Sequence, residues 1–111
     1  MRTIDLFGVD ELRDGEMRMA WVDGTDQVLV IRQAGEFTAV QGICSHEYFE
    51  LDKGFLTSGT LTCALHLSRF DLSDGEPLDP PADAPLAVYP VRVVDGRVCI
   101  EVPDGPLEVN G

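Results

Sequence analysis

Basic residues and histidines are scarce in this chain of 111 residues. Only 8 lysines and arginines stand against 20 acidic residues, and the formal net charge is −12. A surface of this charge repels nucleic-acid phosphates, which argues against DNA or RNA as a partner. It suits electrostatic steering toward a basic protein, although an acidic surface can also serve solubility alone.

Long apolar stretches are absent as well. No segment approaches the ~20 residues of a membrane span. Residues 1–6 contain no apolar region of signal-peptide length. We therefore expect a cytoplasmic, monomeric protein that does not contact a membrane. Its length suffices for one domain, residues 1–111, with a single modest hydrophobic core.

Helical periodicity is nearly missing, and short β-prone runs separated by Gly, Asp and Pro recur instead. Asp95-Gly96 is a strong hairpin signal, and Ala34-Gly35 is a second turn. Runs this short and this regularly spaced predict an all-β fold, a sandwich or barrel. Strands are expected at 16–22, 27–32, 36–41, 60–62, 68–72, 87–94 and 97–102, with one short helix at 9–13.

Three loops interrupt the strand pattern. They cover about residues 43–54, 63–68 and 76–85. The third contains four of the seven prolines, which stiffen a loop without hydrogen bonds. Such stiffness is useful where a group must be held or shielded.

The first two loops contain the only two histidines and two of the three cysteines. Cys44-Ser45-His46 and Cys63-Ala64-Leu65-His66 form the pattern C-x-H-x16-C-x2-H. Two cysteines and two histidines can bind one zinc ion, but structural zinc usually uses C-x(2–4)-C and H-x(3–5)-H units. A [2Fe–2S] cluster fits the spacing better, with both cysteines on one iron and both histidines on the other. Zinc remains the alternative.

These two boxes resemble the cluster-binding boxes of Rieske proteins. Further matches to ferredoxin components of bacterial multicomponent oxygenases lie at Arg69-Phe70-Asp71, Gly75, Pro80-Pro81-Ala82 and Tyr89-Pro90-Val91-Arg92-Val93. The resemblance implies small antiparallel sheets with a loop-built cluster-binding subdomain. It also implies a Rieske-type [2Fe–2S] cluster with Cys44 and Cys63 on the inner iron, and His46 and His66 on the outer iron.

Some positions depart from the Rieske pattern. Phe49 and Leu65 stand where high-potential members have an additional cysteine pair, so no disulfide can join the two loops. Ser68 keeps a hydroxyl that donates to a cluster sulfur in those proteins, whereas Phe70 lacks the second one. Hydrogen bonds to sulfur raise the potential, so we expect a value toward the low end of the ~−150 to +300 mV Rieske range. Leu67 occupies a position where many relatives have glycine.

The resemblance implies an electron carrier rather than an enzyme. The sequence has no serine–histidine pair to spare and no flavin or nicotinamide fingerprint. Electrons would therefore come from a flavin-dependent NAD(P)H reductase and pass to a terminal oxygenase. Phe70-Asp71 and Pro80-Pro81-Ala82 favour a ring-hydroxylating dioxygenase over a diiron aromatic or alkene monooxygenase. A non-redox zinc-binding module is the alternative of another class.

Other conspicuous residues have structural interpretations. We expect Cys99 to be a packed structural cysteine rather than a ligand, because no histidine or second cysteine is near it in the sequence. Trp21 is expected to be a core residue. A docking surface is predicted at Tyr48, Phe49, Leu67 and Pro81, with at least one of the two aromatic residues in the core. An acidic run is either a solvated loop or a steering surface: Asp71, Asp74, Glu76, Asp79 and Asp83.

Overall fold

The computed structural model describes residues 2–22, 26–44, 49–57, 59–64, 67–79 and 84–104. Almost all of its regular structure is strand, and the two helical segments are single 3₁₀ turns, η1 and η2. Within the described part of the chain, no helix has the length and apolarity needed to cross a membrane. The elements are β1 (Arg2–Gly8), η1 (Val9–Glu11), β2 (Met17–Val22), β3 (Asp26–Gln33), β4 (Glu36–Gln41), η2 (Leu51–Lys53), β5 (Phe55–Thr57), β6 (Thr60–Thr62), β7 (Arg69–Asp71), β8 (Val88–Tyr89), β9 (Val91–Val94) and β10 (Arg97–Val102).

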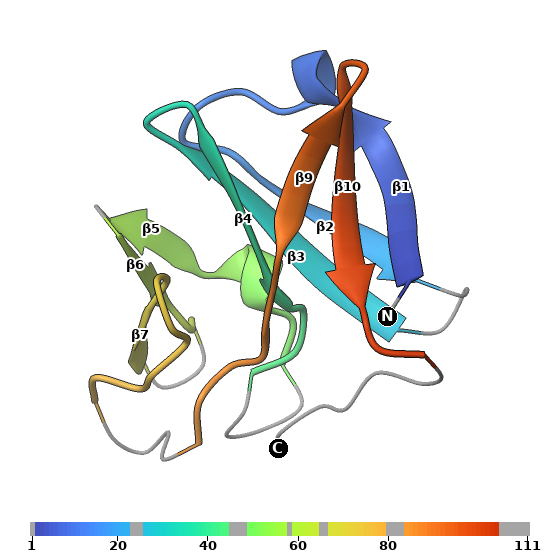
Figure 1. Cartoon of the computed structure of the whole chain (residues 1–111). Coiled ribbons are helices and arrows are strands. Elements are labelled where there is room, and N and C mark those ends of the chain that lie inside the picture. Colours follow the sequence, from blue (N-terminus) through green and yellow to red (C-terminus); the bar gives the residue numbers. More distant parts are fainter. Residues whose placement is uncertain are drawn as a thin grey trace.

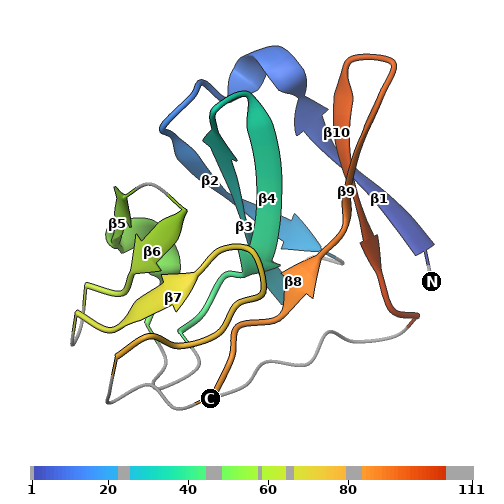
Figure 2. The ribbon, with the colours of Figure 1, turned by 60° about the vertical axis from the view of Figure 1, so that its left-hand side comes forward.

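The strands form three antiparallel sheets, ordered β1-β10-β9, β2-β3-β4-β8 and β5-β6-β7. Figures 1 and 2 show the four-stranded sheet between the other two, so that β3 and β4 face a different sheet on each side. We call the sheets β1-β10-β9 and β2-β3-β4-β8 together the base. The all-β class and the small antiparallel sheets expected from the sequence are confirmed.

Strand β3 lies between two hydrophobic cores and contributes side chains to both. Val28 and Val30 pack into a base core with Val98 and Ile100 of β10. Successive side chains of a strand point to opposite faces, so the residues between them point the other way. Leu29 and Ile31 therefore lie in the second core, which we call the site core. This explains the unbroken apolar run of β3, because a strand buried on both faces has no polar alternation.

The predicted strands match the structure where the turn signals are strong. Asp95 and Gly96 both have positive φ, 51° and 74°, and they join β9 to β10 as the hairpin signal predicts. The single strand expected at 87–94 is divided into β8 and β9 at Pro90, which has no N–H to donate to a ladder. The helix expected at 9–13 is only the 3₁₀ turn η1. Strands β1 and β5 were not predicted.

Trp21 is not a core residue, contrary to the sequence-based expectation. Its side chain is 59% exposed, whereas its neighbour Val22 is fully buried in the base core. The alternation along β2, which is an edge strand, directs Val22 inward and Trp21 toward solvent. Cys99, by contrast, is buried at 6% exposure, as expected, with its Sγ atom 3.9 Å from the Arg97 carbonyl oxygen.

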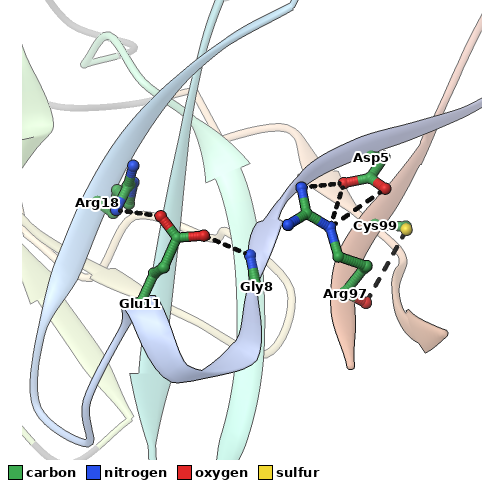
Figure 3. Close-up of polar contacts among 6 residues, drawn as sticks. All are labelled: Asp5, Gly8, Glu11, Arg18, Arg97 and Cys99. Atoms are coloured by element: carbon green, nitrogen blue, oxygen red, sulfur yellow. Dashed lines mark hydrogen bonds and ion pairs between the residues drawn. The ribbon is translucent and has the colours of Figure 1, made fainter. Parts of the chain in front are cut away.

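Polar contacts fasten β1 to the rest of the base (Figure 3). The Arg97 guanidinium donates to the Asp5 carboxylate, with Nη2–Oδ1 at 2.9 Å and Nε–Oδ1 at 3.0 Å. One Glu11 oxygen accepts the Gly8 N–H at 2.7 Å, and the other lies 3.5 Å from Arg18. The N-terminal strand is thus fixed at the hairpin end of β10 and along β2.

Candidate metal centre

The first cysteine of the sequence pattern lies in a loop between β4 and η2. Its backbone N–H donates to the Phe49 carbonyl at 2.9 Å. Next to this bond, Ile43 and Glu50 form an isolated antiparallel β-bridge. The Leu51 N–H then donates to the Gly42 carbonyl at 2.8 Å. These backbone bonds close the loop at its base and place Cys44 at the start of the enclosed segment.

The second cysteine has the same backbone arrangement after β6. The Cys63 N–H donates to the Ser68 carbonyl at 2.9 Å, and the Leu67 N–H returns to the Cys63 carbonyl at 2.9 Å. In both loops the cysteine N–H bonds to the carbonyl five residues later, at Phe49 and at Ser68. The two boxes are therefore held in matching closed loops, a similarity that the sequence spacing does not reveal.

Both cysteine side chains belong to the site core. Cys44 and Cys63 are each 2% exposed, and neither forms a disulfide. Their apolar neighbours in this core include Leu51, Leu61 and Phe70, which are all fully buried. Two thiols in one apolar enclosure, reduced and on separate closed loops, are a donor set that fits the thiolate side of an iron–sulfur cluster.

Some of the predicted site residues fall outside the described residues. These are His46 and His66, together with Tyr48, Leu65, Pro80, Pro81 and Asp83. Within the described ranges no group of three His, Cys, Asp or Glu side chains is placed to hold a metal ion.

The two residues beside the second box are well defined. Ser68 is 1% exposed, so its side chain lies in the protein interior, and its backbone carbonyl accepts the Cys63 N–H. Leu67 has φ of 59°, the left-handed region that glycine adopts without cost, and its side chain is 62% exposed. This backbone angle explains why glycine suits the position, and here leucine adopts it.

The acidic run is more structural than the sequence indicated. Asp79 makes a bidentate ion pair with Arg69, with Nε–Oδ2 at 2.6 Å and Nη2–Oδ1 at 3.1 Å. Hydrogen bonding from Arg69 lowers the pKa of Asp79 below its ordinary value. Asp71 accepts hydrogen bonds from the N–H and hydroxyl of Ser73, which lower its pKa, and Asp74 accepts the N–H of Glu76 at 2.9 Å. These three carboxylates hold the turn after β7 and attach the following segment to it.

Two residues that support the site were missed at the sequence level. Arg69 entered the prediction only as part of a motif, yet it fastens the chain at the start of the proline-rich segment. Gln41, the last residue of β4, is 1% exposed and contacts the first cysteine loop. A polar residue that ends an apolar strand was the only sequence signal for Gln41.

The Rieske [2Fe–2S] domain profile matches residues 3–90, which include both cysteine loops and all of the site core. The chain belongs to the Rieske [2Fe–2S] family. Members of this family carry a Rieske-type [2Fe–2S] cluster, and the buried thiol pair is consistent with it. The zinc interpretation of the Cys–His pattern receives no support from this match.

Named relatives of this Rieske protein are ferredoxin components, which transfer electrons and are not themselves the catalytic subunits. It is 35% identical over 97 residues to the anthranilate 1,2-dioxygenase ferredoxin subunit of Burkholderia cepacia, covering 87% of this chain and 89% of the relative. It is 38% identical over 106 residues to the ferredoxin component of the alkene monooxygenase system of Xanthobacter autotrophicus (strain ATCC BAA-1158 / Py2), covering 95% and 85%.

A solved structure shows the same fold. The chain superimposes with a TM-score of 0.83 on a chain in the complex of reduced oxygenase and oxidized ferredoxin in carbazole 1,9a-dioxygenase. The two are 26% identical, and the match covers 88% of this chain and 91% of that one.

Proposed function

We propose that this protein is the ferredoxin of a multicomponent oxygenase, and that Cys44, His46, Cys63 and His66 bind its [2Fe–2S] cluster. The observation that carries the proposal is the pair of buried cysteines, which lie in one core at the same position of two matching closed loops. Each of these loops also supplies one histidine in the sequence, so the ligands are two mixed pairs.

The protein's own residues have clear tasks in this function. The thiolates of Cys44 and Cys63 would hold one iron of the cluster, and the site core around them excludes water from their sulfur atoms. The imidazoles of His46 and His66 would hold the other iron. When bound, the cluster supplies one-electron redox chemistry. The base holds the two loops in place and takes no part in that chemistry.

The partners follow from this function and from the named relatives. The electron donor is a flavin-dependent NAD(P)H reductase, and the acceptor is a terminal oxygenase. A net charge of −12 suits transient docking on a basic surface of each partner in turn. The relatives include components of both system types. The Phe70-Asp71 and Pro80-Pro81-Ala82 matches make a ring-hydroxylating dioxygenase the first candidate and a diiron aromatic or alkene monooxygenase the second.

Docking through the site end, by which we mean β5, β6, β7, residues 72–79 and the two cysteine loops, is supported by the exposure of its apolar residues. Leu67 is 62% exposed in the loop that carries His66, and Leu78 beyond β7 is 48% exposed. Phe49, by contrast, is partly buried against the site core, so it is more a core residue than a docking residue. Leu67 is the described residue that we place on the docking surface.

The ligand assignment is tested by three serine variants. Cys44→Ser and Cys63→Ser should each lose the red-brown colour and most of the iron and acid-labile sulfide. Cys99→Ser is the matched control, because Cys99 is also buried but lies on β10 in the base. It should retain iron, sulfide and colour at wild-type levels. Equal loss in all three variants, or colourless wild-type protein with one zinc ion per chain, would contradict the assignment.

The electron-carrier role is tested by reduction with NADH. NADH alone should leave the oxidised visible spectrum unchanged, since the chain has no flavin or nicotinamide fingerprint of its own. Addition of a catalytic amount of a flavoprotein reductase from a dioxygenase system should bleach the spectrum. Bleaching by NADH without a reductase would show that the protein is more than a carrier.

A further inference from the structure

Gln41 joins three segments of the chain at the boundary between the base and the site. Its side-chain Nε2 donates to the Ile43 carbonyl at 2.7 Å, and its Oε1 accepts the Ala87 N–H at 2.7 Å. Its own backbone N–H donates to the Ala87 carbonyl at 2.9 Å. The side chain is 1% exposed, so these bonds form in the protein interior, where an unpaired partner costs about 1–3 kcal/mol.

The first of these bonds acts on the peptide group directly before Cys44. The carbonyl of that peptide accepts from Gln41, and its N–H, which belongs to Cys44, donates to the Phe49 carbonyl at 2.9 Å. A planar peptide bonded at both ends cannot rotate about the chain axis. Gln41 on one side of this peptide and Phe49 on the other therefore set the direction in which the Cys44 side chain leaves the backbone.

The second bond acts on Ala87, which follows the proline-containing loop of residues 76–85. Ala87 follows Leu86, whose N–H donates to the Gly75 carbonyl at 2.8 Å and whose side chain is buried in the site core. Both the N–H and the carbonyl of Ala87 are bonded to Gln41. One side chain thus connects the first cysteine loop to the segment 84–87.

We propose that Gln41 is a positioning residue for the metal centre: it orients the peptide that precedes Cys44 and couples this peptide to the segment 84–87. The proposal rests on the proposed function, because it assigns Gln41 to the same cluster. Its consequence is that loss of the Gln41 amide alters the geometry and lifetime of the cluster, beyond any loss of protein stability.

Gln33 provides a matched control within the same sheet. Its Nε2 donates to the Thr57 carbonyl at 3.1 Å, and its Oε1 accepts the Gly59 N–H at 3.3 Å. Gln33 is thus a second glutamine that bridges the base to the sheet β5-β6-β7. Like Gln41, it donates through Nε2 and accepts through Oε1. Its contacts lie at the β5–β6 turn and do not involve a cysteine loop. Gln33→Met removes a bridge of the same chemical kind, although a more exposed one, without touching the peptide before Cys44.

The test compares Gln41→Met and Gln33→Met in the holoprotein. We expect Gln41→Met to shift the EPR g values and the midpoint potential. We also expect it to bleach about tenfold faster under a chelator, the factor that corresponds to one hydrogen bond of roughly 1.4 kcal/mol. Gln33→Met should keep wild-type g values, potential and bleaching rate while losing some thermal stability. Gln41→Asn keeps the amide but shortens its reach, so it should behave as Gln41→Met does. It replaces Gln41→Met in the test if the methionine variant does not fold.

Two outcomes would overturn the proposal. If both Gln41 variants keep wild-type g values, potential and bleaching rate, or if Gln33→Met changes these properties equally, then Gln41 has only a general structural role. A wild-type protein without a Rieske signal is a different failure, since it removes the proposed function and the positioning role together.

Discussion

The base and the site end of this protein are stabilised in different ways. In the base, β3 pairs six of its residues with β2 and six with β4, and the base core lies between two sheets. The site end has strands of only three residues. Each of its cysteine loops is closed by a few backbone hydrogen bonds rather than by a long ladder of paired residues. From this difference we expect the base to keep its fold without the cluster, whereas the site end should depend on the group it binds.

Removal of the cluster should give the largest effect. Without metal ligation, the site end should open while the base remains folded, because short strands and isolated hydrogen bonds give little local stability. We expect hydrogen exchange at Leu61 and Cys63 to accelerate on the order of 100-fold or more. Exchange at Val30 and Ile100, on the central strands of the two base sheets, should change little. Equal acceleration in both regions would show that the protein unfolds as one unit.

Gly75→Ala should destabilise the site end strongly through the backbone alone. Gly75 has φ of +81°, and an added Cβ would overlap the backbone oxygen of Leu86. We expect a loss of about 2 kcal/mol or more in the free energy of unfolding, measured by chemical denaturation of the holoprotein. Gly35→Ala in the base is the control, since its φ is +78° but no atom lies within 4 Å of the added Cβ. It should cost about 1 kcal/mol, and equal costs would contradict the close approach at Gly75.

Ser68→Ala tests the hydroxyl beside the second box. If this buried hydroxyl donates to a cluster sulfur, its loss should lower the midpoint potential by about 40 mV, the one-electron equivalent of about 1 kcal/mol. Protein-film voltammetry at constant pH measures the shift directly. An unchanged potential would mean that Ser68 serves the protein interior alone.

Asp79→Asn should give the smallest effect, a thermal midpoint lower by a few degrees at most at pH 7. The pKa of Asp79 is held below its ordinary value of 3.8 by Arg69. Its contribution to stability is therefore complete above pH 3.8 and disappears as the pH falls through the lower folded-state pKa. The difference between wild type and Asp79→Asn should accordingly vanish in acid.

The exposed Arg97–Asp5 pair of the base provides the control for this variant. Asp5→Asn should lower the thermal midpoint to a similar degree, but it should leave the bleaching rate of the cluster unchanged. Asp79→Asn should accelerate bleaching, because Asp79 fastens the segment beside β7. Identical bleaching rates in the two variants would show that the ion pair at Asp79 supports the cluster no more than the ion pair in the base does.

The sequence predicted what is local and missed what depends on distant partners. β3 and the β9–β10 hairpin were predictable because apolar runs and the Asp95-Gly96 turn are encoded in a few adjacent residues. β1 was not predicted because it is completed by β10, at the other end of the chain, and has a register shift between Asp5 and Phe7. β5 was missed because three residues are too few for a periodic signal.

The site shows the same division. The cysteine–histidine pairs are local in the sequence, and their spacing favoured the iron–sulfur interpretation while zinc stayed the alternative. The supports of the site are not local: Gln41 bonds to Ala87, 46 positions away, and Arg69 bonds to Asp79, 10 positions away. Trp21 was misassigned because its exposure depends on β2 lying at a sheet edge. Side-chain bridges and edge positions become visible only once the strands are paired.

Pulsed EPR of the dithionite-reduced protein distinguishes mixed cysteine–histidine ligation from other ligand sets. Mixed ligation predicts a spin-half signal with an average g value below that of all-cysteine clusters, modulated by two directly bound imidazole nitrogens. His66→Cys should remove one nitrogen coupling and lower the potential, or lose the cluster. A reduced wild-type protein whose signal carries no nitrogen coupling, or a colourless protein that binds only zinc, would rule out this ligation.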